Sequence, residues 1–200
     1  MAKKQVGRRV EGWKAKSWFK VHVPENLGKA YIGDTIANDA GSVVGRIMQA
    51  TLGEITNDYA KQHIKMEFKI ANVTGDAAYT EFVGHEVTRD YLRGLIKRRS
   101  TRIDCLIPIM TKDQKKVRLT ISCYTLARAN VGQVHAIRNA ITANVQAQAA
   151  AWDLNTLVTG IVTGEISRDL FKVVKPLYPV RRVEIIKSKV EPVAAPVSTE

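Results

Sequence analysis

The chain has 200 residues, 45% of them apolar, and its 31 lysines and arginines exceed its 19 aspartates and glutamates, giving a net charge of +12. This size allows one ordinary hydrophobic core, and no run of about twenty apolar residues predicts a membrane span. The first twenty residues are basic and lack the apolar segment of a secretory signal, so we expect a cytoplasmic protein with no membrane partner. The positive field attracts polyanions, which makes nucleic acid the leading class of partner.

Composition divides the chain into three segments. Residues 1–17 are rich in Lys, Arg and Gly and predict a basic arm that orders on binding, although a merely solvated tail fits the same composition. Residues 18–190 carry apolar patterns without a linker and predict a single domain. Residues 191–200, EPVAAPVSTE, predict a disordered tail.

The first half of the domain has the alternation typical of strands. Strands are predicted at 18–24, 32–37, 46–52, 64–73 and 79–87, separated by the turn residues NDAG and by a polar segment around EITNDYAKQH. Thr88 is then placed to cap a helix with Asp90 in its first turn, and Leu92, Leu95 and Ile96 form its apolar stripe.

Two long strands follow at 101–111 and 116–126, joined by the polar loop KDQKK. Pro108 has no amide hydrogen and predicts an edge or a bulge in the first of them. Cys105 and Cys123 lie in apolar runs, so we expect both thiols to be buried and reduced.

From Asn130 the apolar period changes to that of helices. One helix is predicted over 130–150, a second from 154 to 162, and a third capped by Ser167 that stops at Pro176. A last strand at 181–189 completes an α+β pattern with a helix-rich final third and a returning strand.

The helix after Thr88 carries cations along one face. Arg89, Arg93 and Lys97 are spaced i, i+4 and i+8, where like charges cost about 0.2 to 0.5 kcal/mol per pair. A phosphate backbone would convert that repulsion into attraction, although a basic helix that is simply solvated is the plain alternative. Gly94 weakens this helix by about 1 kcal/mol, which close packing would explain better than a close approach to RNA.

Further cations occur in the arm, in the hairpin loop and in the last strand. Those of the hairpin loop are Lys112, Lys115, Lys116 and Arg118, and Lys189 is one of those in the last strand. Basic patches dispersed over several elements suit binding to folded RNA. Arg138 can equally pair with a carboxylate, while Trp13 and Trp18 can stack on bases, although a tryptophan in a strand is more often core. The cations that we predict to contact RNA are Lys3, Lys4, Arg8, Arg9, Lys14, Lys16, Lys20, Arg89, Arg93, Lys97, Arg98, Arg99, Arg102, Arg128, Arg138, Arg181, Arg182 and Lys187.

The residues give little support to catalysis. His85, Glu86 and Asp90 are the candidates for an enzyme acting on nucleic acid, but no nucleophile motif or phosphate loop accompanies them. The four histidines are scattered and form no ligand pair with a cysteine, so we expect neither a metal nor a cofactor.

Three blocks together resemble one family. They are WFKVHVP near residue 18, FVGHEVTRDYLRGLIK at 82–97, and GEISRDLFKVVKPLYPVRRVEIIKSKV at 164–190. The third includes Ile166, Arg168, Asp169, Leu170 and Lys172, followed by Leu177, Tyr178 and Pro179. In order and spacing these blocks resemble the eS1 (formerly S3Ae) ribosomal protein family of archaea and eukaryotes, and the compact chain suggests an archaeal member.

The resemblance implies a structural protein of the small ribosomal subunit, on its platform near the messenger exit. It implies an α+β fold with a central, antiparallel, barrel-like sheet and flanking helices. The implied partners are small-subunit ribosomal RNA and neighbouring platform proteins, with messenger RNA near the exit as a further candidate. A free RNA-binding regulator is the alternative from the residues alone.

Overall fold

The computed structural model describes residues 16–191, which fall into two compact units. The amino-terminal unit comprises residues 16–48 and 68–82, and the carboxy-terminal unit comprises residues 49–67 and 83–191. Residues 1–15 and 192–200, which hold most of the predicted arm and tail, lie outside the described residues. The boundaries predicted at 17 and 190 therefore stay predictions.

The amino-terminal unit is built on a small mixed sheet. Strands β1 (Ser17–His22) and β2 (Tyr31–Ala37) pair antiparallel, while β1 pairs parallel with the start of β5 (Ala77–Val87). Strand β4 (Ile64–Thr74) pairs with β5 and with β3 (Ile47–Thr51). Two short 3-10 helices, Glu25–Leu27 and Ala40–Ser42, connect these strands. The core of this unit includes Phe19, Val21, Val43, Ile70 and Ala78.

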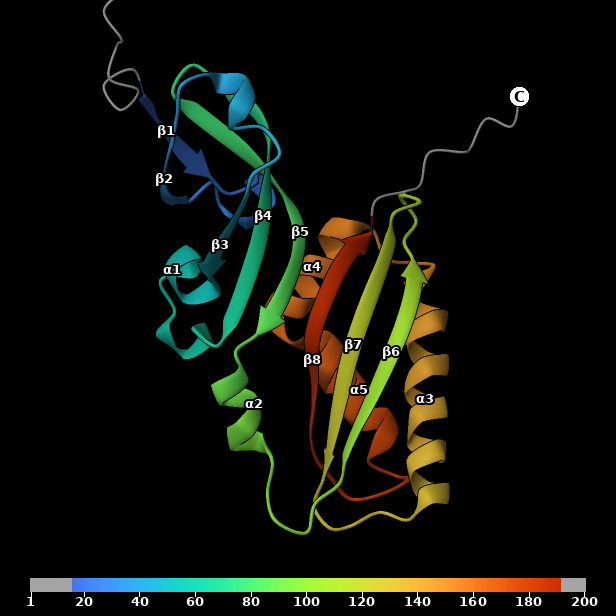
Figure 1. Ribbon diagram of the computed structural model, residues 1–200. Coiled ribbons are helices and arrows are strands. Elements are labelled where there is room, and N and C mark those ends of the chain that lie inside the picture. Colours follow the sequence, from blue (N-terminus) through green and yellow to red (C-terminus); the bar gives the residue numbers. More distant parts are fainter. Residues whose placement is uncertain (1–15, 192–200) are drawn as a thin grey trace, which may run out of the picture. The chain divides into compact units, whose positions relative to one another are not determined.

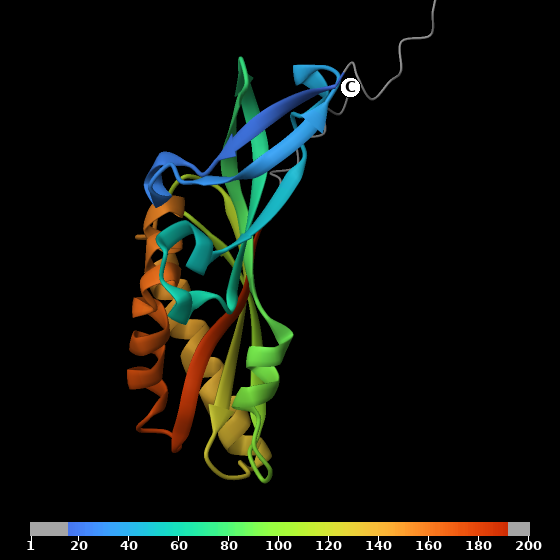
Figure 2. The ribbon, with the colours of Figure 1, turned by 90° about the vertical axis from the view of Figure 1, so that its left-hand side faces the viewer.

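The carboxy-terminal unit is a sheet covered on one side by helices. Its strands are the end of β5, β6 (Arg102–Met110), β7 (Lys116–Thr125) and β8 (Val180–Glu191), all antiparallel neighbours in the order β5-β8-β7-β6. Helices α3 (Val131–Ala149), α4 (Leu154–Thr163) and α5 (Glu165–Val174) lie on one side of β6, β7 and β8 (Figures 1 and 2). Shorter elements are α1 (Leu52–Thr56), a 3-10 helix at Tyr59–Lys61 and α2 (Arg89–Leu95).

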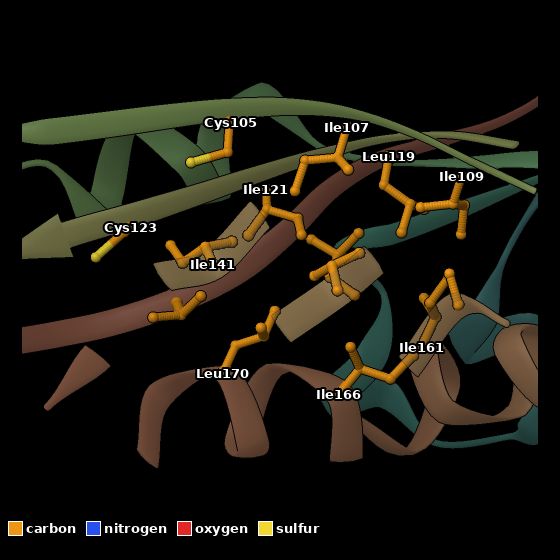
Figure 3. Packing of buried hydrophobic residues seen from close by; sticks show 14 of the residues in the cluster. Cys105, Ile107, Ile109, Leu119, Ile121, Cys123, Ile141, Ile161, Ile166 and Leu170 are labelled. Atoms are coloured by element: carbon orange, nitrogen blue, oxygen red, sulfur yellow. The ribbon is translucent and has the colours of Figure 1, made fainter. Parts of the chain in front are cut away.

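The period-two pattern of β6 and β7 explains the core of this unit. Every second side chain, including Ile107, Leu119 and Ile121, faces the helices and is buried, while the alternate ones face away. Figure 3 shows these side chains meeting Ile141, Ile166 and Leu170 from α3 and α5. The strands β6 and β7 thus gain most of their stability from apolar burial against helices.

The α+β class is confirmed, but the barrel is not. Within residues 16–191 the strand order β2-β1-β5-β8-β7-β6 ends at β2 and at β6 without closing, and the β1–β5 pair makes the sheet mixed instead of antiparallel. Pro108 lies on the edge strand β6, as predicted, where its missing amide hydrogen removes one donor from the free edge.

The five strands predicted in the first half are confirmed as β1 to β5, but one predicted helix boundary was wrong and one short helix was not predicted. Helix α5 begins at Glu165, not after Ser167, because Gly164 with φ +75° can end α4 and start α5 at once. The segment predicted as polar loop contains α1, which Thr51 and Glu54 start with a reciprocal capping box.

Candidate nucleic-acid interface

Three loops of the carboxy-terminal unit meet at one end of the sheet formed by β6, β7 and β8 (Figure 1). They lead from α2 into β6, from β7 into α3, and from α5 into β8. We define the basic loop end as residues 96–102, 126–130 and 175–181. The first and third of these ranges extend to Arg102 and Arg181, the first charged residues of β6 and β8.

Hydrogen bonds between the loops hold the basic loop end together. The amide of Thr101 donates to Oγ1 of Thr125 over 2.8 Å, and the amide of Ala129 donates to Oγ1 of Thr101 over 3.1 Å. On the other side, the amide of Leu126 donates to the carbonyl of Pro179 and the hydroxyl of Tyr178 donates to the carbonyl of Arg128, both over 3.1 Å. The middle loop is thereby fastened to both of its neighbours.

The charge of the basic loop end has one sign. Its three segments contain no Asp or Glu and carry seven cations, Lys97, Arg98, Arg99, Arg102, Arg128, Lys175 and Arg181, all of them exposed. Only Arg102 among these seven has an ion pair with a described residue, through its Nε 2.8 Å from Oδ1 of Asp104. Self-repulsion on this scale costs stability in the free protein, and a bound polyanion would relieve it.

The predicted basic helix is shorter than expected. Helix α2 ends at Leu95 and Ile96 is extended, so Lys97 does not lie on the face shared by Arg89 and Arg93. The reason is Ser100, whose Oγ accepts from the amide of Lys97 and donates to its carbonyl, replacing the helical bonds of that turn. Arg89 and Arg93 are both exposed, and Nη1 of Arg93 lies 4.0 Å from Oδ1 of Asp90.

Two details of α2 also differ from prediction. Thr88 occupies the N-cap position, but its side chain makes no capping hydrogen bond. A Cβ built on Gly94 would meet no described atom within 4 Å, so close packing within the described chain does not explain this glycine. Close approach to an RNA backbone remains as the other interpretation.

Other predicted RNA contacts have internal partners. Arg182 is 2.5 Å from Oε1 of Glu184, and its guanidinium carbon lies 5.7 Å from the centre of the Tyr91 ring. Lys187 is paired with Glu86 at 2.8 Å across the β5–β8 ladder. Arg138 is half-buried on α3, and its positive charge acts to lower the pKa of the nearby Cys105 thiol, against the larger effect of burial. It has no ion pair with a carboxylate among the described residues.

Two cations of the hairpin segment are neutralised in the same way. Glu191 lies 3.3 Å from Nζ of Lys116 and 2.6 Å from Nη2 of Arg118. The opposite end of the β6–β7 hairpin therefore differs from the basic loop end, because part of its positive charge is already balanced.

The arm cations Lys3, Lys4, Arg8, Arg9 and Lys14, and with them Trp13, lie outside the described residues. Lys16 and Lys20 are exposed in the amino-terminal unit. Stacking on bases and packing in the core were both open for Trp18. Its side chain is 58% exposed on β1, which excludes the core, because it lies on the face opposite Phe19 and Val21. Lys175 was not predicted as a contact, because the sequence placed it at the end of the third helix, before Pro176, whereas α5 ends at Val174.

His85 is a structural residue of the core. It is 2% exposed, its Nδ1 accepts from Oγ of Ser188 over 2.6 Å, and its Nε2 donates to the carbonyl of Ile185 over 3.1 Å. Burial lowers the pKa of the imidazole to about 4, which favours the neutral ring that these two bonds require. Both ring nitrogens are occupied, so His85 has no free atom for acid–base catalysis.

Gly84 explains why the FVGH block must contain a glycine. A Cβ at this position would lie 2.4 Å from the carbonyl oxygen of Ser188, a distance that real Cβ atoms do not reach. The close approach of β5 to β8 brings His85 within hydrogen-bonding distance of Ser188.

Cys105 and Cys123 are buried free thiols, as expected. Burial raises the pKa of both, to about 12 for Cys123. Across residues 16–191, no group of three or more His, Cys, Asp or Glu side chains is arranged to hold a metal ion. No described helix has the length and apolar character needed to cross a membrane.

Comparison with known proteins identifies the family. The model of the Ribosomal S3Ae family matches residues 4–193. The chain is 81% identical over 197 residues to the small ribosomal subunit protein eS1 of Methanoregula boonei, covering 98% of each chain. It is 62% identical to the protein of that name from Methanoculleus marisnigri, covering 96% of this chain and 98% of the relative, and 37% identical to that of Methanothermobacter thermautotrophicus, covering 95% and 97%.

These relatives are archaeal, in agreement with the expectation from the chain's compact length, and the resemblance drawn from the three sequence blocks is confirmed. A match over nearly the whole length, with relatives of this identity and coverage, shows that the chain belongs to the Ribosomal S3Ae family.

Proposed function

We propose that this protein is a structural component of the small ribosomal subunit in the cytoplasm, and that it binds ribosomal RNA through the basic loop end. The observation that carries the proposal is the convergence of seven exposed cations and no carboxylate on three loops that hydrogen bonds hold together. Relatives over the full length are named as small ribosomal subunit proteins. No reaction chemistry is part of this role.

The loops are suited to phosphate binding because six of their cations are not neutralised by any described carboxylate. Each phosphate contact contributes about 0.7 to 0.9 to the slope of log affinity against log salt. If most of these six cations meet a phosphate, they would contribute about 4 to the slope, a value that is easily measured.

The test compares two triple variants that remove the same charge from opposite ends of one hairpin. The variant Arg98→Gln, Arg99→Gln, Arg128→Gln is expected to lower the salt slope for small-subunit RNA by about 2 to 3. The control Lys112→Gln, Lys115→Gln, Lys116→Gln should leave most of the slope in place. Equal losses in the two variants would show that only total charge matters and would contradict the assignment.

We place this contact at the platform near the messenger exit, with platform proteins and messenger RNA as further partners; the family resemblance supports this placement. Because both native thiols are buried, a single new cysteine made by Arg98→Cys can carry a hydroxyl-radical probe selectively. The family resemblance also implies a position near the 3′ end of the small-subunit RNA, so cleavage is expected there. Cleavage confined to other regions would refute the location.

Co-sedimentation distinguishes this role from that of a free RNA-binding regulator. In a sucrose gradient of a native lysate, the protein should travel with the small subunit until high salt removes it. Migration as a free small protein at low salt would favour the regulator.

A further inference from the structure

The carboxy-terminal unit contains a pocket of about 530 Å³ that the basic loop end does not account for. It lies between the first half of β8, the junction of α4 and α5, and residues 61–64. Its volume falls in the range of sites that hold small molecules, about 300 to 1,000 Å³. The question is what chemistry its walls would accept.

The pocket combines an apolar interior with aromatic and hydroxyl groups. Ile161, Val183 and Ile185 are buried residues that line it, and Phe171 adds a half-buried aromatic ring. Another wall includes His63, whose ring stacks on that of Tyr91 with the centres 4.0 Å apart. A flat, partly apolar group would fit such surroundings, because it can stack on rings and cover aliphatic side chains.

The rim of the pocket is cationic. Lys61, Arg168, Lys172, Arg181 and Arg182 line it. Lys61 is paired with Asp58 and Lys172 with Asp169, two carboxylates that do not line the pocket themselves. One carboxylate, Glu184, does line it. That carboxylate is already engaged by Arg182 at 2.5 Å. Arg168 and Arg181 are exposed and have no ion pair with any described residue. The ligand should therefore carry negative charge next to its flat group.

We propose that this pocket receives one unpaired nucleotide of the bound RNA, with its base against the apolar wall and its phosphates at Arg168 and Arg181. Charge complementarity and continuity support this choice, because Arg181 belongs both to the rim and to the basic loop end. Proteins read single-stranded RNA in this way, by stacking splayed bases on aromatic and guanidinium planes. The inference rests on the proposed RNA-binding function and extends it to the kind of RNA recognised.

A variant that fills the pocket without changing charge tests the proposal. Thr163 is an exposed residue of α4 that lines the pocket, so Thr163→Trp should occupy its mouth in a protein that still folds. Thr159→Trp, one turn earlier at another exposed position that does not line the pocket, is the matched control. The probes are a labelled single-stranded octanucleotide of mixed sequence and a blunt 16-base-pair RNA duplex, measured by fluorescence anisotropy with the full chain.

We expect Thr163→Trp to raise the dissociation constant of the single strand about tenfold or more, since a lost stacking contact has this size. For the duplex, the affinity of Thr163→Trp and the salt slope of its binding should match those of Thr159→Trp. Unchanged single-strand binding, or equal weakening for strand and duplex, would overturn the nucleotide site while leaving RNA binding intact. An acidic peptide that binds the wild type, is blocked by Thr163→Trp and leaves strand binding unaffected would assign the pocket to a protein instead.

Arg168→Gln is a second variant, which removes one rim charge without adding bulk. It should weaken single-strand binding and lower its salt slope by about 0.7, the value for one phosphate on a single strand. An unchanged slope would contradict the phosphate contact. If the wild type binds neither RNA, the proposed function itself fails, so the two failures are distinguishable.

Discussion

Two glycines ten residues apart in the same sequence block are expected to respond in opposite directions to alanine. A Cβ on Gly84 would lie 2.4 Å from the carbonyl oxygen of Ser188 and 3.5 Å from Cα of Lys189, and both contacts are backbone that no side-chain rotation can relieve. A Cβ on Gly94 would meet no described atom within 4 Å. Gly84→Ala should therefore destabilise the protein, whereas Gly94→Ala should stabilise it.

The size of the Gly84→Ala effect follows from what must move. To relieve the contact, β5 has to shift from β8 where His85 opposes Ser188, which disrupts hydrogen bonds of 2.6 and 3.2 Å to the Ser188 hydroxyl. Overpacking costs about 1 to 3 kcal/mol, and a buried polar group left unpaired costs about 1 to 3 kcal/mol more. We expect a loss of about 2 to 6 kcal/mol, or a drop in melting temperature on the order of 10 °C.

Gly94→Ala provides the control, because it adds the same methyl group at an exposed helical position. Alanine is favoured over glycine in a helix by about 1 kcal/mol, so a gain of about 0.5 to 1 kcal/mol is expected. Urea unfolding followed by far-ultraviolet circular dichroism measures both variants against the wild type. A Gly84→Ala protein within about 0.5 kcal/mol of wild type would refute the close-approach argument.

Three further predictions concern the core and the exposed face of α2. Because burial lowers the pKa of His85 to about 4, below the 6.5 of an unperturbed imidazole, only the unfolded chain takes up a proton between these values. The free energy of unfolding should fall by about 3 kcal/mol from pH 6.5 to pH 4, and urea midpoints for His85→Asn should lack this component. Cys123, whose pKa burial raises to about 12, and Cys105 should react with a thiol reagent at pH 8 only in denaturant; prompt reaction of native protein would contradict their burial. If RNA approaches Gly94, Gly94→Leu should fold normally but enter reconstituted subunits less well than wild type, and equal incorporation would exclude this contact.

The sequence was a good guide where one face of an element is buried. Strand β6 follows its alternating pattern residue by residue, and so does the first half of β7, while α3 buries Ile137, Ile141 and Val145 as its spacing predicts. In these elements apolar burial and backbone preference agree, so periodicity alone finds them.

Prediction failed where a local hydrogen bond or a glycine sets the end of a helix against the apolar periodicity. Ser100 ends α2 before Lys97 by bonding both backbone groups of that residue, and Gly164 sets the start of α5 in place of Ser167. The capping box of Thr51 and Glu54 was visible in the sequence as T-x-x-E, yet the apolar run behind it was too short to indicate a helix.

Closure of the sheet was equally inaccessible from the residues. An alternating strand looks the same whether its neighbours form a barrel or an open ladder, and the parallel pairing of β1 with β5 leaves no local signature. The free edge at β6 was the exception, because Pro108 has no amide hydrogen for a strand ladder and therefore predicts an edge strand or a bulge.

The same limit applies to the candidate interface, where the partner of a cation can lie far away along the chain. The sequence revealed every cation of the basic loop end, but it did not reveal which cations have acidic partners. Lys187 finds Glu86 across 101 positions, and Arg118 finds Glu191 on the neighbouring strand, whereas Arg98, Arg99 and Arg128 come together with no carboxylate in their loops. Since a paired cation must lose its carboxylate before it gains a phosphate, unpaired ones contribute more to RNA binding. The fold therefore separates two groups of cations that composition alone treats as equal, and it brings six of the unpaired ones together at one end of one sheet.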